Sequence, residues 1–342
     1  MKQSPPTIRA IAKAAGVSIS TVSRALNSSV PVSNATRKKI ESAIELLNNN
    51  RNKSGVGYRY VGIIMPAASS ENLKEHPLLY SIVSSFEDYL ASFDIIPKVL
   101  NYDKLSDEIS SLLQPPMDGY FVIGTSSEDD SVILNAMHSL HAPWIILNRR
   151  LENENISYVC IDDEYASESA VRHFIELGHR RIAFVGGNRD YQNTVRRYKG
   201  YTAALLKAGI PLREEYVFYG QYSELFGYKI GKELISLQPL PTAAFFASDT
   251  IAIGCMNYLT GHGLQIPKDI AVFGFGNISK SEKCNPPLST IDQRYEDTGI
   301  VAAKSLLQLM DTPSIAYQHI LVKTTLIIRK SSGAVVNDLK HY

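Results

Sequence analysis

Short hydroxyl side chains crowd one stretch near the N-terminus, together with a single arginine. Residues 18–27 read Ser-Ile-Ser-Thr-Val-Ser-Arg-Ala-Leu-Asn. Hydroxyls at the start of a helix can hold a phosphate group, because the first backbone N–H groups of the helix point at the same anion. Arg24 on such a helix can donate two hydrogen bonds to O6 and N7 of a guanine in the DNA major groove. The residue types of this stretch therefore suit contact with DNA.

Three predicted helices position this stretch. Apolar residues recur at helical spacing in residues 8–15 and again in residues 19–26, and a third such stripe runs from Ile40 to Leu47. A candidate N-cap precedes each of the three runs: Thr7, Ser18 and Ser33. Three short helices can share one small core, which leaves the hydroxyls of the second helix exposed. The alternative is an ordinary three-helix subdomain in which Arg24 pairs with a carboxylate.

The charge distribution favours the first interpretation. Residues 1–60 hold ten lysines and arginines against two glutamates, whereas residues 61–342 hold 25 basic and 32 acidic residues. The formal net charge of +1 for the whole chain therefore hides a basic head on an acidic body. Such an asymmetry is typical of a module that binds nucleic acid.

Four motifs near the N-terminus occur in a recognisable order. They are Thr7-Ile8-Arg9, Ala15-Gly16-Val17-Ser18, Thr21 to Asn27, and Val32-Ser33-x-x-Thr36-Arg37. Together they resemble the head of the lactose/galactose repressor family of bacterial transcription regulators. This resemblance implies that Ile19, Ser20 and Arg24 read bases. It also implies phosphate contacts by a set of polar residues: Thr7, Ser18, Thr21, Ser23, Asn27, Ser33 and Thr36.

Length and composition exclude several other classes of protein. The chain has 342 residues, of which 44% are hydrophobic and 20% charged, as in an ordinary globular protein with two or three domains. No run of eighteen apolar residues and no secretory segment occurs, so we expect a cytoplasmic protein without membrane contact. Three cysteines lie far apart, and the histidines form no cluster, so no metal or cofactor is expected. Without a G-x-S-x-G, an H-E-x-x-H or a phosphate loop, we expect no catalytic residues and no enzyme.

Strand-like and helical segments alternate through the body of the chain. Nine strands are predicted, at residues 60–65, 95–100, 119–123, 143–147, 158–161, 181–185, 215–219, 242–247 and 269–273. Eight helices are predicted, at 77–92, 105–113, 131–140, 164–177, 195–208, 223–237, 249–262 and 293–310. This alternation indicates α/β architecture with two doubly wound parallel-sheet subdomains, divided near residues 148–165. The predicted division of the chain is a helix-turn-helix head (1–47), a linker (48–60), a ligand-binding and dimerisation core (61–330) and a tail (331–342).

The family resemblance extends through this core. It rests on Leu177 to Gly187, Ser248-Asp249-x-x-Ala252-x-Gly254, Ile266-Pro267-x-Asp269-Ile270 and Pro287 to Ile291. The core of that family is similar to periplasmic sugar-binding proteins, which implies a small molecule bound between two lobes. The positions that match the family's ligand contacts are Asn148, Asp162, Arg197, Tyr222, Ser248, Asp249, Gly276 and Gln293.

Side-chain chemistry suggests roles for three of these positions. Arg197 and Asp249 could grip hydroxyls or a carboxylate of the ligand, and Tyr222 could stack on a ring. Local alternatives exist, because Asp249 could cap the helix at 249–262, Asp162 or Asp163 could cap the helix that follows them, and Arg197 could belong to a surface ion pair.

The chain departs from the family pattern at three places near this site. Ser248 stands where the family often has asparagine, and Gly276 stands where it usually has aspartate. Leu78 and Leu79 replace paired aromatic residues. The loss of a carboxylate and of two aromatic platforms points away from a typical sugar, toward a different carbohydrate or another metabolite.

The linker departs further. Residues 48–60 contain no proline and no leucine, whereas the family has a short hinge helix whose leucines wedge into the minor groove. We therefore expect Arg51 and Lys53 to follow phosphates or a narrow minor groove without intercalating. Without a wedged side chain, the DNA site that the protein binds is expected to stay nearly straight.

These observations together predict a cytoplasmic, homodimeric transcription regulator, most simply a repressor of a carbohydrate or other catabolic operon. Two heads related by two-fold symmetry match a palindromic operator in double-stranded DNA. A small-molecule effector, possibly a sugar, controls the affinity for that operator. The alternative is a sugar-binding protein without a regulatory role on DNA, which needs a signal peptide and no basic head.

Overall fold

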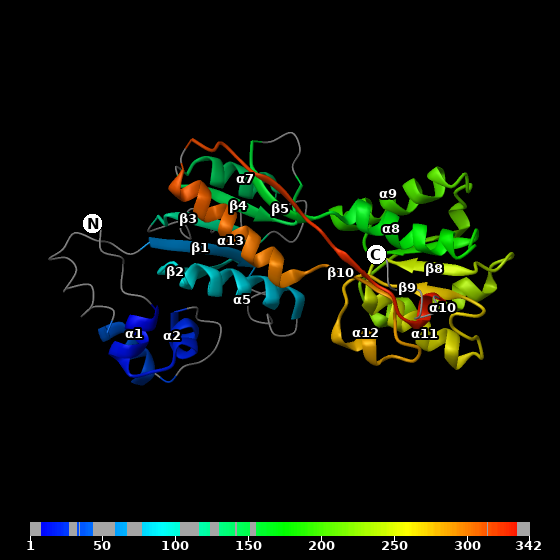
Figure 1. The fold of residues 1–342 in the computed structure, drawn as a ribbon, viewed down its shortest axis with the longest axis horizontal. Coiled ribbons are helices and arrows are strands. Elements are labelled where there is room, and N and C mark those ends of the chain that lie inside the picture. The colour runs from blue at the N-terminus through cyan, green and yellow to red at the C-terminus, as the bar shows by residue number, and fades with distance from the viewer. Residues whose placement is uncertain are drawn as a thin grey trace. The chain divides into compact units, whose positions relative to one another are not determined.

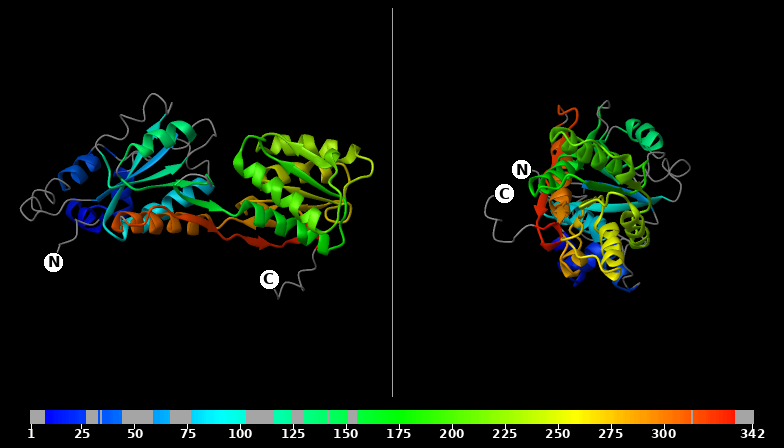
Figure 2. Two further views of the ribbon diagram at one scale, coloured as in Figure 1. Left: turned by 90° about the horizontal axis from the view of Figure 1, so that it is seen from above. Right: turned by 90° about the vertical axis from the view of Figure 1, so that its right-hand side faces the viewer.

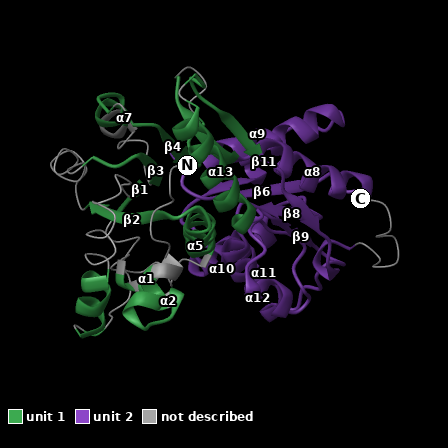
Figure 3. Ribbon diagram, turned by 60° about the vertical axis from the view of Figure 1, so that its left-hand side comes forward, with its two compact units in different colours: residues 1–160, 295–321 green, residues 161–294, 322–342 purple. Residues whose placement is uncertain are grey.

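The computed structural model divides into two compact units. It describes residues 8–26, 33, 35–43, 59–66, 77–102, 116–123, 130–140, 142–150, 155–312 and 314–333. Unit 1 comprises Met1–Cys160 and Tyr295–Leu321 (Figure 1). Unit 2 comprises Ile161–Arg294 and Val322–Tyr342 (Figure 3). Each unit thus takes its residues from separate stretches of the chain.

Short helices form the N-terminal head of unit 1. These are α1 (Ile8–Ala15), α2 (Ile19–Leu26) and a further helix over residues 35–43. Gly16 lies in the turn between α1 and α2 with a φ of +67°, a left-handed conformation that glycine adopts without strain. Ile11, Val22 and Ile40, one from each helix, are buried together. The head therefore has the predicted shared core.

A six-stranded sheet forms the centre of unit 1, in the order β11-β5-β4-β3-β1-β2. Its strands are β1 (Arg59–Pro66), β2 (Ile95–Tyr102), β3 (Gly119–Ile123), β4 (Trp144–Leu147), β5 (Ser157–Ile161) and β11 (His319–Val322). The neighbours from β2 through β5 all pair in parallel. The same unit contains the helices α5 (Pro77–Ala91), α7 (Asp130–His138) and α13 (Tyr295–Asp311).

A four-stranded parallel sheet forms the centre of unit 2, in the order β7-β6-β8-β9. Its strands are β6 (Ile182–Gly186), β7 (Val217–Tyr219), β8 (Ala243–Phe246) and β9 (Ala271–Phe273). Four helices flank the sheet (Figure 2): α8 (Asp163–Glu176), α9 (Gln192–Lys207), α10 (Glu224–Ser236) and α11 (Asp249–Gly261). Alternate strand residues enter different cores, because Phe245 packs with α8 and α9 whereas Phe246 packs with α10 and α11. Both faces of the sheet are therefore covered.

The nine predicted strands correspond to β1–β9, and the α/β fold class with two parallel-sheet subdomains is confirmed. Several short elements are not in the prediction: the 3-10 helix η2 (Glu214–Tyr216), α12 (Ser279–Lys283), β10 (Thr290–Asp292), β11, β12 (Thr325–Ile327) and the 3-10 helix η3 (Lys330–Ser332). β10 and β12 pair antiparallel in unit 2. The predicted helix at 105–113 and residues 48–58 of the linker lie outside the described residues. No helix among the described residues is long and apolar enough to cross a membrane.

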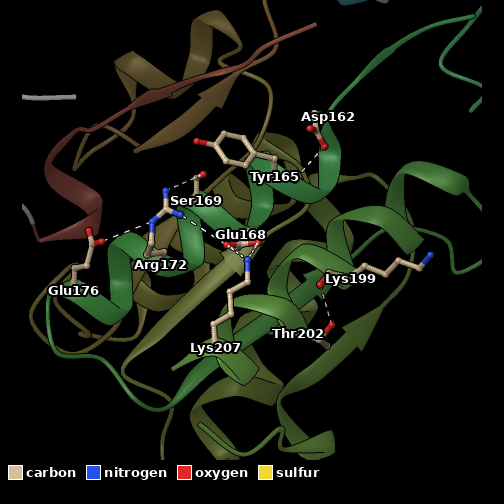
Figure 4. A network of polar contacts seen from close by, with 9 residues as sticks. All are labelled: Asp162, Tyr165, Glu168, Ser169, Arg172, Glu176, Lys199, Thr202 and Lys207. Atoms are coloured by element: carbon tan, nitrogen blue, oxygen red, sulfur yellow. Dashed lines mark hydrogen bonds and ion pairs between the residues drawn. The ribbon is translucent and has the colours of Figure 1, made fainter. Parts of the chain in front are cut away.

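Polar contacts tie α8 to α9 at their outer surface (Figure 4). The Lys207 ammonium donates to both oxygens of Glu168, at 2.7 and 2.8 Å. Arg172 lies 3.8 Å from Glu168 and 3.7 Å from Glu176 along the same helix. Beneath this surface the two backbones approach closely at Gly200, where an added Cβ would lie 2.2 Å from the carbonyl oxygen of Glu164. Gly200 is therefore required by the packing of the two helices.

We expect Gly200→Ala to lower the free energy of unfolding by about 1–3 kcal/mol, the usual cost of overpacking a core. The backbone of α8 cannot move away from the new methyl group as a flexible side chain could. Gly261→Ala in α11 is the matched control, because an added Cβ there meets nothing within 4 Å. Urea unfolding of the three proteins checks the prediction. Equal midpoints for Gly200→Ala and the wild type would contradict it.

The C-terminal segment is anchored in unit 2 by serines. Ser331 and Ser332, which the prediction placed in the tail, are fully buried. The Ser331 hydroxyl donates to the carbonyl of Val272 at 2.7 Å, and the Ser332 hydroxyl lies 3.2 Å from Nε2 of His173. Burial, followed by the charge of His179, lowers the pKa of His173 to about 4. The core of unit 2 thus extends beyond residue 330.

His173 should make the stability of the protein fall as the pH falls from about 6.5 to about 4. In this window the unfolded chain binds a proton at His173 and the folded chain does not, so acid favours unfolding. We expect His173→Gln to flatten this part of the dependence of unfolding free energy on pH. Urea midpoints of both proteins at several pH values measure it. Parallel curves for the two proteins would exclude His173 as the titrating group.

Candidate functional sites

Two hydroxyl pairs lie at helix N-termini in the head. The Ser18 hydroxyl accepts a hydrogen bond from the backbone N–H of Thr21 at 3.1 Å, and its oxygen lies 2.6 Å from that of the Thr21 hydroxyl. The helix over residues 35–43 repeats this arrangement, with Ser33 accepting from the N–H of Thr36 at 3.2 Å. The predicted N-caps at Ser18 and Ser33 are therefore confirmed. In each case a second hydroxyl, that of Thr21 or Thr36, lies beside the cap at the positive end of the helix dipole.

Ile19 adds an exposed apolar side chain beside the first hydroxyl pair. Its side chain is 46% exposed, directly after Ser18 in the first turn of α2. An exposed aliphatic group among hydroxyls suits the methyl group of thymine in the major groove. Ser20, Ser23 and Arg24 lie on the same helix by sequence position. The other predicted DNA contacts lie outside the described residues: Thr7, Asn27, Arg51 and Lys53.

Arg197 is the buried centre of a polar cluster in unit 2. Its Nε donates to Oδ1 of Asp163 at 2.7 Å, and its Nη1 donates to the carbonyl oxygen of Ala247 at 2.6 Å. The guanidinium carbon lies 3.7 Å from the centroid of the Phe275 ring. Arg197 is only 6% exposed, so the alternative of a surface ion pair is wrong. Burial raises the pKa of Asp163, and the adjacent Arg197 guanidinium opposes that rise.

Tyr222 lies beside this cluster, with its hydroxyl fixed. The phenolic oxygen is 2.7 Å from Oγ1 of Thr194, which lies one helical turn before Arg197 in α9. The Tyr222 ring lies over Gly187, where an added Cβ would come within 2.1 Å of the ring. The ring of Tyr191 is nearly parallel to it, with an interplanar angle of 8° and centroids 6.3 Å apart. The two rings offer aromatic faces next to a charged group.

Asp249 is enclosed by donors of its own chain. It is fully buried, and its carboxylate accepts from the Thr290 hydroxyl at 2.5 Å, the Ser281 hydroxyl at 2.7 Å and the Ile278 N–H at 3.0 Å. Burial raises the pKa of Asp249, and these donors oppose the rise. The N-cap of α11 is Ser248, whose hydroxyl accepts from the Thr250 N–H at 3.1 Å, so the alternative that Asp249 caps this helix is wrong. Its carboxylate instead fixes the loop after β9.

Gly276 and Gln293 adjoin Asp249. Gly276 has a φ of +135°, and an added Cβ would lie 3.6 Å from Oδ2 of Asp249 and 3.8 Å from Nε2 of Gln293. The backbone N–H of Asp249 donates to the carbonyl oxygen of Phe275 at 2.9 Å, which joins this group to the Arg197 cluster through one loop. The structure thus places Arg197, Ser248, Asp249, Gly276 and Gln293 in connected segments of unit 2.

The two remaining predicted contacts have local roles. Asp162 is the N-cap of α8 and accepts from the Tyr165 N–H at 3.2 Å, as its capping alternative predicted. Asn148 belongs to unit 1, where it is exposed with a φ of +55° and its N–H donates to Val159 at 2.9 Å.

Sequence reasoning missed Asp163, Tyr191 and Thr194. Asp163 had a signal in the Asp-Asp pair at the start of α8, but only the fold identifies which carboxylate reaches Arg197. Among the described residues no group of three His, Cys, Asp or Glu side chains is arranged to hold a metal ion.

Comparisons with known proteins agree with this architecture. The family model described as bacterial regulatory proteins, lacI family, matches residues 7–52. A second model, the periplasmic binding protein-like domain, matches residues 171–332. The chain is 33% identical over 335 residues to the probable HTH-type transcriptional repressor ExuR of Bacillus subtilis (strain 168), covering 95% of this chain and 98% of that protein. It is 31% identical over 317 residues to catabolite control protein A of Priestia megaterium, covering 90% and 94%.

Solved structures of regulators are similar over most of the chain. The complex of the transcriptional regulator CelR with cellobiose has a TM-score of 0.70 at 28% identity, covering 95% of this chain and 99% of that one. A LacI family regulator from Enterococcus faecium with bound ribose has a TM-score of 0.68 at 25% identity, covering 81% and 100%. These relatives are transcription regulators, which are not enzymes. The helix-turn-helix head, the paired parallel sheets and these relatives show that the chain belongs to the lacI family of bacterial regulatory proteins.

Proposed function

We propose that this protein is a repressor whose affinity for operator DNA is set by a small molecule bound at the Arg197 cluster of unit 2. The observation that carries the proposal is the buried Arg197, fixed by Asp163 and Ala247 beside the half-buried Tyr222. A charged donor held in advance next to aromatic faces suits a polar ring-shaped ligand, because little ordering remains to be done on binding. The repressors and ligand-bound regulators among the relatives support this assignment.

The effector is a carbohydrate or a related polar metabolite. Arg197 and Tyr222 hold it directly, with Gln293, Ser248 and the Gly276 backbone at the neighbouring wall, and Asp249 positions that wall. Asp162, at the start of α8, completes the proposed contacts within unit 2. The relatives with bound cellobiose and ribose support the carbohydrate class. Gly276 supplies no carboxylate. The ligand therefore meets fewer hydrogen-bond acceptors at this position than a sugar meets in the typical site of the family.

On DNA, two copies of the chain bind one palindromic operator. One reading helix contacts too few base pairs for useful specificity, and a two-fold dimer doubles that number. Ile19, Ser20 and Arg24 read the bases, and the hydroxyls at Ser18, Thr21, Ser33 and Thr36 hold phosphates together with Thr7, Ser23, Asn27, Arg51 and Lys53. The protein needs no metal or cofactor for this function.

Fluorescence anisotropy with DNA from upstream of its own and neighbouring genes tests the proposed function. We expect a palindromic segment to bind at least about 10³-fold more tightly than unrelated DNA, the usual margin for a specific site. A panel of sugars and sugar acids should contain one compound that shifts this affinity. Failure to prefer any segment would favour the alternative, a sugar-binding protein without a regulatory role on DNA.

Arg24→Ala should remove preference at one base pair. If Arg24 pairs with a guanine, its loss costs about 1–3 kcal/mol at the operator and little on unrelated DNA. Lys38→Ala is the control. Lys38 lies on the helix over residues 35–43, and the loss of a phosphate contact there weakens binding to all sequences alike and flattens the dependence on salt. Binding-site selection with both variants measures the effect. An unchanged consensus for Arg24→Ala would exclude Arg24 as a reader of bases.

A further inference from the structure

Unit 2 contains a cavity beside α9, on a face of this helix different from the one that carries the effector cluster. Thr194 and Arg197 belong to the effector cluster, whereas Val195 and Tyr198 line the cavity, which has a volume of about 320 Å³. The opposite wall comes from edge strand β7 and the turn before it. The lining residues are Arg189, Val195, Tyr198, Glu214, Val217 and Tyr219. This volume is within the range of small-molecule sites.

The aromatic part of the wall is rigid. The rings of Tyr198 and Tyr219 have centroids 6.0 Å apart and an interplanar angle of 61°. Both rings pack against the buried Phe184, at 5.4 and 5.9 Å. Val195 and Val217 add aliphatic surface, so the cavity has a preformed apolar half.

Opposite charges line the other half without pairing. The guanidinium carbon of Arg189 lies 4.3 Å from the centroid of the Tyr219 ring, which fixes it at the wall. Burial raises the pKa of both Tyr198 and Tyr219; the charge of Glu214 adds to this rise and the charge of Arg189 opposes it, so the two charges act on the same two phenols.

Neither charge has an ion-pair partner within the described part of the chain, although Arg213 and Glu215, which flank Glu214 in the sequence, pair with each other at 3.6 Å. Both side chains are exposed to solvent, so a ligand that carries both charges can pair with the two of them at once.

We propose that this cavity binds a zwitterionic α-amino acid with an apolar side chain. The carboxylate accepts hydrogen bonds from Arg189, and the ammonium group meets Glu214 and a ring face of the tyrosine pair. The side chain packs on Val195 and Val217. A neutral sugar satisfies neither charge, and a simple anion or cation satisfies only one.

The position of the cavity connects it to the effector cluster. Tyr198 directly follows Arg197 in α9, so a ligand that packs on Tyr198 restrains the turn that carries Arg197. An amino acid bound here is therefore a second input to the regulator, separate from the proposed effector.

Calorimetric titration of the full-length protein tests this proposal with a matched series. L-Phenylalanine and L-leucine are the zwitterionic probes; phenethylamine lacks the carboxylate, and 3-phenylpropanoate lacks the ammonium group. We expect one of the amino acids to bind, and the two single-charge analogues of phenylalanine to bind at least about tenfold more weakly than phenylalanine, because each loses one charge-assisted contact.

Substitutions locate the binding. Glu214→Gln and Arg189→Gln should each weaken amino acid binding at least about tenfold. Glu214→Gln should leave 3-phenylpropanoate unaffected, and Arg189→Gln should leave phenethylamine unaffected. Glu215→Gln, adjacent in sequence but outside the cavity, and Tyr222→Phe in the effector cluster should both bind the amino acid like the wild type.

Four results would overturn the proposal. The first is that neither amino acid binds at millimolar concentration. The second is that the single-charge analogues bind as tightly as phenylalanine, and the third is that the Glu214 and Arg189 variants bind the amino acid like the wild type. Loss of binding in Tyr222→Phe with retention in Glu214→Gln would place the amino acid in the effector cluster and would also overturn it.

Discussion

Arg197→Ala is expected to lower the free energy of unfolding by about 3–5 kcal/mol, because it leaves the Asp163 carboxylate buried without its counter-charge. The same change exposes the Phe275 ring face and frees the Ala247 carbonyl oxygen of its donor. Under conditions where the variant is folded, it should bind the operator and fail to respond to the effector. Urea unfolding and effector titration of operator binding measure the two consequences.

A double variant separates the two roles of Arg197. Arg197→Met combined with Asp163→Leu replaces the buried ion pair by apolar groups of similar volume, which often restores stability. It should recover most of the lost unfolding free energy and still show no effector response. Arg172→Ala is the control, since this exposed arginine on α8 lies at 3.7 Å or more from its glutamate partners and contributes little.

Two results would contradict the role of Arg197. A normal effector response in the stabilised double variant would exclude it from the effector site. Wild-type stability of Arg197→Ala would show that the ion pair with Asp163 contributes nothing to folding.

The sequence predicts the head and the sheets well because their signals are local. The Ser18 cap, Gly16 in the turn and the apolar stripe through Ile11 lie within one or two helical turns of each other. Strands such as β3 and β8, buried along their whole length, appear as short apolar runs between polar segments. Such patterns depend on neighbours in sequence, so they can be read without the fold.

The short late elements escape prediction for the opposite reason. β10 and β12 are three residues each, and they pair across a separation of about thirty-five residues. A serine adds a contact between the same two segments, through the hydrogen bond from the Ser289 hydroxyl to the Arg329 carbonyl oxygen at 2.8 Å. No periodic pattern of apolar residues in the local sequence indicates a strand this short.

The candidate effector site shows the same limit at single residues. Residue type and position identify Arg197 as a site residue, but the choice of Asp163 over Asp162 as its partner depends on how α8 packs against α9. For Asp249 the position near the site was predicted, and the enclosure of its carboxylate was not. Its partners at 278, 281 and 290 are brought together only by the loop after β9.

Asp249→Ala is expected to cost at least about 3 kcal/mol of unfolding free energy, because it leaves several buried donors without an acceptor. The hydroxyls of Ser281 and Thr290 lose their acceptor in a fully buried setting, as does the Ile278 N–H. Ser248→Ala at the preceding position is the matched control, since it removes one helix cap at a cost of about 1 kcal/mol. Urea unfolding compares the two variants.

A positioning role for Asp249 predicts non-additivity with its donors. Thr290→Val removes one donor in place, so the double variant Asp249→Ala, Thr290→Val should be less destabilised than the sum of the single changes. The affinity for the effector should fall partly, not completely, in Asp249→Ala, because the wall formed by Gly276 and Gln293 loosens. Asp249→Asn, which keeps one acceptor oxygen, should recover part of the lost affinity. If Asp249→Ala kept wild-type stability and lost the effector response completely, the carboxylate would contact the effector directly, and its assignment as a positioning residue would be wrong.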